Sequence, residues 1–134
     1  MTIEQFAQTF SVNVRRDSCG ESIIPGKPRK EKRPEDRSHI FLYSEDEKTF
    51  GVLLTFSTAR RWNSVRERLV AAGFTLGQKG DREGTLLFDP TDSRQANAAI
   101  REAGIRVTTE AMRNRGRNSA LVRRTTPIAE GFVF

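Results

Sequence analysis

Arginines near the end of this 134-residue chain are the residues whose type and spacing most directly suggest chemistry. The segment RNRGRNSALVRR, residues 113–124, holds five arginines and no acidic residue. A guanidinium group binds phosphate oxygens through two parallel hydrogen bonds, and a protein that neutralises phosphates gains affinity because counterions are released. The phosphate ligands predicted in this part of the chain are Arg106, Arg113, Arg115, Arg117, Arg123 and Arg124.

A second basic segment, GKPRKEKRPEDR, covers residues 26–37. It contains two prolines and one glycine but no aliphatic or aromatic residue, so it has nothing to bury. This composition predicts a basic mobile loop over residues 26–38. Its predicted phosphate ligands are Lys27, Arg29, Lys30, Lys32 and Arg33.

The net charge of +6 is distributed unevenly along the chain. Residues 26–37 carry six bases and three acids, and residues 106–134 carry six arginines and two acids. Residues 38–105 carry nine of each and are neutral as a segment. Basic flanks around a neutral domain favour a polyanionic partner, either DNA or RNA, bound with low sequence specificity.

Two aromatic residues could stack on unpaired bases. Phe41 and Tyr43 lie on one face of a predicted strand, whereas Ile40 and Leu42 lie on the other. If the helices cover only one side of the sheet, one of these pairs faces outward. An exposed Phe41 and Tyr43 pair would then form a platform for single-stranded nucleic acid.

Catalytic chemistry has weaker support in the sequence. Asp17, Glu21 and Lys27 resemble the two carboxylates and lysine of metal-dependent nucleases, but the usual short spacing is absent. Cys19 and His39 are the single cysteine and histidine, which excludes an internal disulfide and a zinc site of the usual Cys/His type. A structural cysteine is favoured over a Cys/His nucleophile pair, and we expect no catalytic residue, metal or cofactor.

The elements that position these residues begin with a helix and a hairpin. Thr2 can cap a helix over residues 2–10, whose apolar residues share one face, and a short irregular hairpin is expected over residues 11–25. Residues 39–56 predict two strands joined by a polar turn. Residues 57–73 predict an amphipathic helix that starts at Ser57 or Thr58 and stops at Gly73.

A second unit has the same plan. Residues 74–90 predict a hairpin with a Gly80-Asp81 turn, followed by a helix that Asp89 caps and that ends before Gly104. Residues 39–73 and 74–104 therefore form a predicted tandem ββα repeat. We expect an α+β fold, ββαββα, with one antiparallel sheet and helices on one face. The predicted domain covers residues 1–105, and residues 106–134 form a basic C-terminal extension.

A wider pattern resembles a family of small uncharacterised proteins of bacteriophages and other bacterial mobile elements. It combines RRDSCGESIIPGK (15–27), GDREGTLLFDP (80–90) and AIREAGI (99–105). Asp17, Cys19, Gly20, Ile24, Gly26 and Lys27 match the family's D-x-C-G and I-x-G-K element. In that family an aromatic strand follows the lysine directly, whereas this chain inserts PRKEKRPEDRS before HIFLY. The resemblance implies a bacterial and viral setting but carries over no activity.

These patterns predict a non-enzymatic nucleic-acid-binding accessory protein of a phage or mobile element. One alternative is a protein–protein interaction module, for example an inhibitor of a host defence complex or a virion-associated component, with an acidic partner. A small metal-dependent nuclease is the second alternative. The N-terminus resembles no signal peptide and no apolar stretch is long enough to cross a membrane, so we expect the host cytoplasm or the virion.

Overall fold

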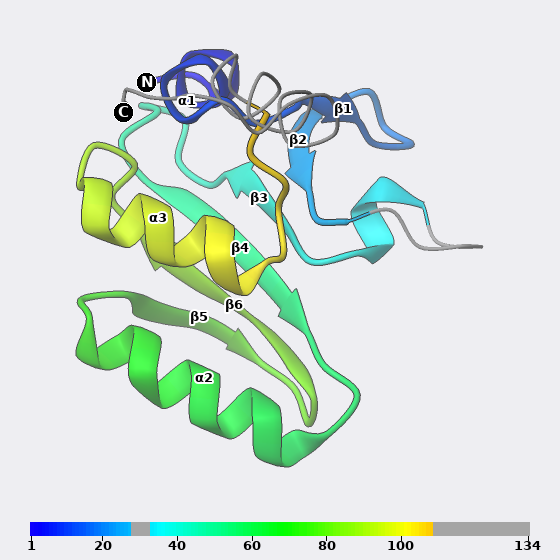
Figure 1. The fold of residues 1–134 in the computed structure, drawn as a ribbon, viewed down its shortest axis with the longest axis vertical. Helices are drawn as coiled ribbons and strands as arrows, with labels where there is room; N and C mark the ends of the chain where they lie inside the picture. The colour runs from blue at the N-terminus through cyan, green and yellow to red at the C-terminus, as the bar shows by residue number, and fades with distance from the viewer. Residues whose placement is uncertain (28–32, 109–134) are drawn as a thin grey trace, which may run out of the picture.

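The computed structural model describes residues 1–27 and 33–108 (Figure 1). This part of the chain contains three α-helices and one short 3₁₀ helix, η1. The helices are α1 (Ile3–Phe10), η1 (Pro34–Asp36), α2 (Ala59–Ala71) and α3 (Ser93–Glu102). The strands are β1 (Arg15–Arg16), β2 (Ser22–Pro25), β3 (His39–Leu42), β4 (Phe50–Thr55), β5 (Thr75–Lys79) and β6 (Glu83–Phe88). The predicted α+β class is confirmed.

All neighbouring strands of the sheet are antiparallel, in the order β1-β2-β3-β4-β6-β5. The irregular hairpin expected over residues 11–25 supplies β1 and β2 at one edge. At the centre, Val52 of β4 pairs with Ile40 on one side and Leu86 on the other. After α3, Val107 forms a single antiparallel bridge with Val12, outside the named strands.

The hydrophobic core lies on one face of this sheet. Phe50, Val52 and Leu54 alternate along β4 and are fully buried. The Phe6 ring of α1 lies 5.2 Å from the Phe50 ring, so α1 covers the same face. Figure 1 shows α3 in front of the central strands and α2 running beside β5.

The packing of α2 on the sheet depends on a large residue meeting a small one. Trp62 is fully buried, and its indole N–H donates to the Gly80 carbonyl at 3.1 Å. A side chain at Gly84 of β6 would collide with the Trp62 ring. The helix begins after the cap residue Thr58, as the sequence allowed, and Gly73 follows it with a positive φ of 108°.

The start of α3 differs from the prediction. Asp92, not Asp89, caps the helix, because its carboxylate accepts from the backbone N–H groups of Arg94 and Gln95. Asp89 accepts from the N–H and hydroxyl of Thr91 and so closes the preceding turn. Both aspartates accept hydrogen bonds from backbone N–H groups, so either could cap a helix, and the prediction that Asp89 caps α3 was wrong.

Candidate functional site

The predicted phosphate ligands fall into two groups. Lys27, Arg33 and Arg106 belong to the described part of the chain. The remaining ligands lie outside the described residues: Arg29, Lys30, Lys32, Arg113, Arg115, Arg117, Arg123 and Arg124.

Lys27 and Arg106 line the same hollow, although 79 positions separate them in the sequence. Its volume is about 170 Å³. We call it the cationic cleft. Its lining residues are Asn13, Arg15, Pro25, Gly26, Lys27, Arg37, Ile105 and Arg106.

Long-range backbone contacts assemble the cationic cleft. The Lys27 N–H donates to the Gly104 carbonyl at 3.0 Å, and the Gly26 N–H donates to the Ser38 carbonyl at 2.7 Å. A Cβ atom at Gly26 would collide with the Ala103 carbonyl oxygen, so only glycine lets β2 approach the end of α3 this closely. The bridge between Val12 and Val107 holds the segment around Arg106 in place.

Four cationic side chains and no acidic side chain line this cleft. Within the described residues, neither Lys27 nor Arg106 forms an ion pair with a carboxylate. Arg15 donates to the Val14 carbonyl at 3.3 Å, and Arg37 donates to the Gly26 carbonyl at 3.4 Å. Three arginines and one lysine that line a small hollow without a lining carboxylate favour an anion of phosphate size.

Arg33 is placed differently from Lys27 and Arg106, the other two described residues that were predicted to bind phosphate. Its guanidinium forms ion pairs with Asp36 at 2.9 Å and Glu35 at 3.7 Å, and it does not line the cleft. The Glu35 carboxylate also accepts from the Ser18 hydroxyl, and that hydrogen bond is the main reason its pKa lies below the ordinary glutamate value. Arg33 therefore stabilises the loop around η1 and is a weaker candidate for phosphate binding.

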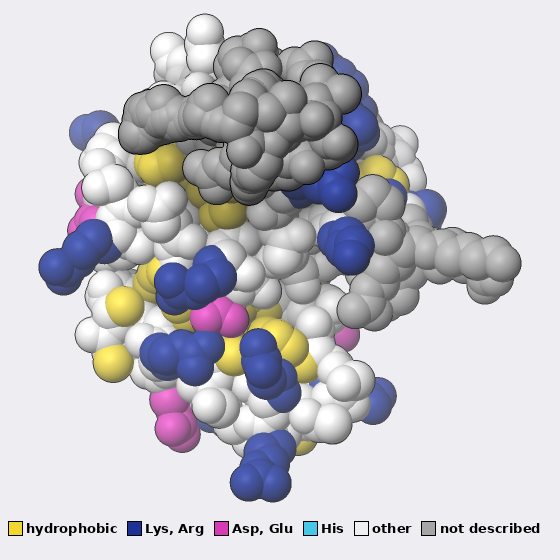
Figure 2. Space-filling model, viewed as in Figure 1, with side chains coloured by type: hydrophobic (Ala, Val, Ile, Leu, Met, Phe, Trp, Pro, Cys, Tyr) yellow, Lys and Arg dark blue, Asp and Glu magenta, His cyan; other side chains and the backbone are white. Residues whose placement is uncertain are grey.

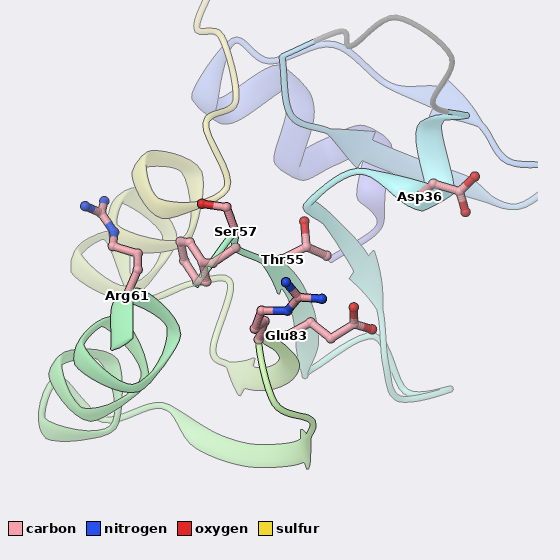
Figure 3. Close-up of a pocket in the computed structure, with 7 residues that line it drawn as sticks. Asp36, Thr55, Ser57, Arg61 and Glu83 are labelled. Carbon is pink, nitrogen blue, oxygen red and sulfur yellow. The ribbon is translucent and has the colours of Figure 1, made fainter. Parts of the chain in front are cut away.

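Two further hollows continue from the cleft toward the end of β4. A bridging hollow of about 320 Å³ shares Gly26, Lys27 and Arg37 with the cationic cleft. A mixed hollow of about 750 Å³ shares Thr55 and Phe56 with the bridging hollow (Figure 3). The mixed hollow is lined by Asp36, Thr55, Phe56, Ser57, Arg61, Arg82 and Glu83. Neighbouring hollows share lining residues, and we refer to the three hollows together as the groove.

The helices carry a basic surface that the segment-by-segment charge did not reveal. Figure 2 shows Lys and Arg side chains gathered over α2 and α3. The helix arginines are Arg60, Arg61, Arg66, Arg68, Arg94 and Arg101. α2 and α3 contain two acidic residues, Glu67 and Glu102. Arg68 holds Glu102 at 2.6 Å, so that carboxylate is already neutralised.

Phe41 and Tyr43 lie on the face of the sheet opposite the core. Phe41 is half-buried because its ring covers Gly51 of β4, and Tyr43 is 57% exposed. The acidic turn with Glu45 and Asp46 follows Tyr43 directly. Negative charge there opposes a phosphate backbone, so this face is a weaker nucleic-acid platform than the groove.

The residues that suggested nuclease or thiol chemistry have structural roles or lie apart. Asp17 accepts from the backbone N–H groups of Cys19 and Glu21 and so forms the turn before β2. His39 is buried beside the other end of β2, where it pairs with Pro25, and its Nδ1 lies 2.7 Å from the Arg37 carbonyl oxygen. In the described ranges, no three His, Cys, Asp or Glu side chains gather where a metal ion could bind.

Comparison with known proteins gives no match to a family model, to a curated protein or to a solved structure. In the part of the chain that the structure describes, no helix is long and apolar enough to cross a membrane. The function must therefore be argued from the groove and its charges.

Proposed function

We propose that this chain is a nucleic-acid-binding protein that holds the phosphate backbone in the cationic cleft. The observation that carries the proposal is the convergence of Arg15, Lys27, Arg37 and Arg106 on one hollow without a lining carboxylate. Phosphate is the repeating anion of nucleic acids, and charge-assisted hydrogen bonds from lysine and arginine are its usual protein contacts.

The basic extension belongs to the same proposal. Arg106 lines the cleft, and the chain continues from there toward the arginines of residues 113–124. An arginine-rich extension that starts beside a bound phosphate can contact the phosphates that follow it along the strand. Binding with low sequence specificity and steep salt dependence is expected, because these contacts read no base.

We infer that residues 39–73 and 74–104 are copies of one ββα unit; the order β3-β4-β6-β5, with the second strand of each unit at the centre, supports this. We also propose a non-enzymatic accessory role in a phage or mobile element, on the resemblance alone. An acidic protein partner would use the same cleft.

A matched pair of variants tests the cleft. The first carries Lys27→Gln and Arg106→Gln. The second carries Lys48→Gln and Arg94→Gln, which removes the same charge from exposed positions outside the cleft. Fluorescence anisotropy with labelled single- and double-stranded DNA and RNA, at about 50 and about 200 mM salt, measures the affinity of each protein.

The cleft variant should bind at least about tenfold more weakly than wild type at low salt, because two charge-assisted contacts are lost. Its affinity should also depend less on salt, by roughly 0.7 in logarithmic slope for each lost contact to a single strand. The matched variant should stay close to wild type. Equal losses in the two variants would show that net charge, not the cleft, governs binding and would contradict the proposal.

A further inference from the structure

The mixed hollow lies at the opposite end of the groove from the cationic cleft, with the bridging hollow between them, and has a different chemical character. Its lining combines two arginines, two carboxylates, two hydroxyl groups and the aromatic ring of Phe56. Its volume of about 750 Å³ lies in the range of small-molecule sites. Figure 3 shows Arg61 on one side of the hollow and Asp36 and Glu83 on the other.

The carboxylates of the mixed hollow indicate that the phosphate backbone of a bound nucleic-acid strand does not run through this hollow. A carboxylate repels phosphate, and none lines the cationic cleft. Glu102, which lines the bridging hollow, is paired with Arg68, whereas the mixed hollow has both Asp36 and Glu83. A strand whose phosphates occupy the cleft can turn its bases toward the mixed hollow, where acceptor groups are useful.

The mixed hollow offers a planar group against which a base can stack. Phe56 is half-buried, with its ring 6.2 Å from the Trp62 ring in a stacked arrangement. The Arg61 guanidinium carbon lies 5.8 Å from the centre of the Phe56 ring. Trp62 supports Phe56 from within the core, and the exposed guanidinium can stack on a base.

Glu83 provides the hydrogen-bonding selectivity. An ionised carboxylate only accepts hydrogen bonds, so it favours bases that carry an exocyclic amino group. Cytosine, adenine and guanine carry one, and thymine and uracil do not. The N3–H donor of thymine and uracil lies between two carbonyl oxygens, which repel a carboxylate. Asp36 is already paired with Arg33, whereas Glu83 forms no ion pair within the described residues. Arg82, next to Glu83, only donates and can reach a base carbonyl oxygen.

We propose that the mixed hollow binds an unpaired base of single-stranded nucleic acid and that Glu83 selects bases with an amino group. This inference rests on the proposed function, because the cationic cleft must first hold the adjoining phosphates. Phosphate contacts in the cationic cleft do not depend on base sequence. Base binding in the mixed hollow adds a preference for bases that carry an amino group.

The test uses the full chain and labelled oligo(dC) and oligo(dT) of equal length in anisotropy titrations, with oligo(C) and oligo(U) as the RNA arm. Wild type should bind the cytosine oligonucleotide at least about threefold more tightly, an effect of less than one net hydrogen bond. Glu83→Gln should remove the preference, because the amide both donates and accepts. Glu67→Gln, at an exposed glutamate on α2, should retain it.

A second variant separates stacking from hydrogen bonding. Phe56→Leu keeps apolar volume but removes the ring, so it should weaken binding to both oligonucleotides and preserve their order. Equal wild-type affinities for the two oligonucleotides, with salt dependence intact, would overturn the base-binding role alone. Absence of binding to either oligonucleotide at low salt would overturn the proposed function as well.

Discussion

At the scale of single residues, Glu35 holds together two segments that are distant in sequence. Its carboxylate accepts from the Ser18 hydroxyl and, at 3.3 Å, from the Ser18 backbone N–H, and it pairs with Arg33 at 3.7 Å. These contacts lower its pKa, with the Ser18 hydroxyl as the largest cause. They therefore stabilise the fold above the ordinary glutamate pKa, and this stabilisation is lost as the pH falls through the lowered value.

Replacement of Ser18 tests this contact. Ser18→Ala should raise the Glu35 pKa toward the ordinary glutamate value, because the main hydrogen bond to the carboxylate is removed. The measurement is the carboxyl ¹³C chemical shift as a function of pH. Asp89, whose pKa is lowered chiefly by the Thr91 hydroxyl, is an internal control and should titrate as in wild type. An unchanged Glu35 titration would show that Ser18 does not hold this carboxylate.

Gly26 lines the cationic cleft and lies against the end of α3, with no room for a Cβ atom. Gly26→Ala should destabilise the protein by about 1–3 kcal/mol, because the new Cβ would collide with the Ala103 carbonyl and force β2 away from α3. Urea unfolding measures the change in the free energy of unfolding. Ser64→Ala, at an exposed site on α2, should stay within about 0.5 kcal/mol of wild type. A Gly26→Ala protein as stable as wild type would contradict this packing.

At the scale of elements, the start of α3 distinguishes the structure from the sequence prediction. Asp92→Ala should destabilise the protein by about 1 kcal/mol, because two backbone N–H groups lose their acceptor. Helical circular dichroism and thermal unfolding check this. Asp81→Ala, in the exposed turn before β6, is the control and should change stability little. An Asp92→Ala protein as stable as wild type would contradict Asp92 as the cap of α3 and would favour Asp89 instead.

Local patterns in the sequence account for most of the elements. Trp62, Val65 and Leu69 are spaced for one helix face, and all three are buried in α2. The Gly80-Asp81 turn correctly joins β5 and β6. The start of α3 was predicted wrongly because aspartates three residues apart can both satisfy backbone donors, and only the surrounding structure decides which begins the helix.

At the scale of the whole molecule, the cationic cleft could not be predicted, although the sequence identified Lys27 and Arg106 as separate candidates. Arg15 and Arg37 join them only because the sheet and the Val12–Val107 bridge bring four chain segments together. The neutral total over residues 38–105 also concealed the helix arginines, because the balancing acids lie mainly in turns. Summing charge by segment loses this spatial separation.

Backbone amide shifts in a titration with a short single-stranded oligonucleotide test the central claim most directly. On a ¹⁵N-labelled full chain at low salt, the largest changes should occur around Arg15, Lys27, Arg37 and Arg106, which line the cationic cleft. Added salt should reverse these changes, because phosphate contacts weaken as counterions compete. Changes confined to other surfaces, or no changes at all, would contradict the account.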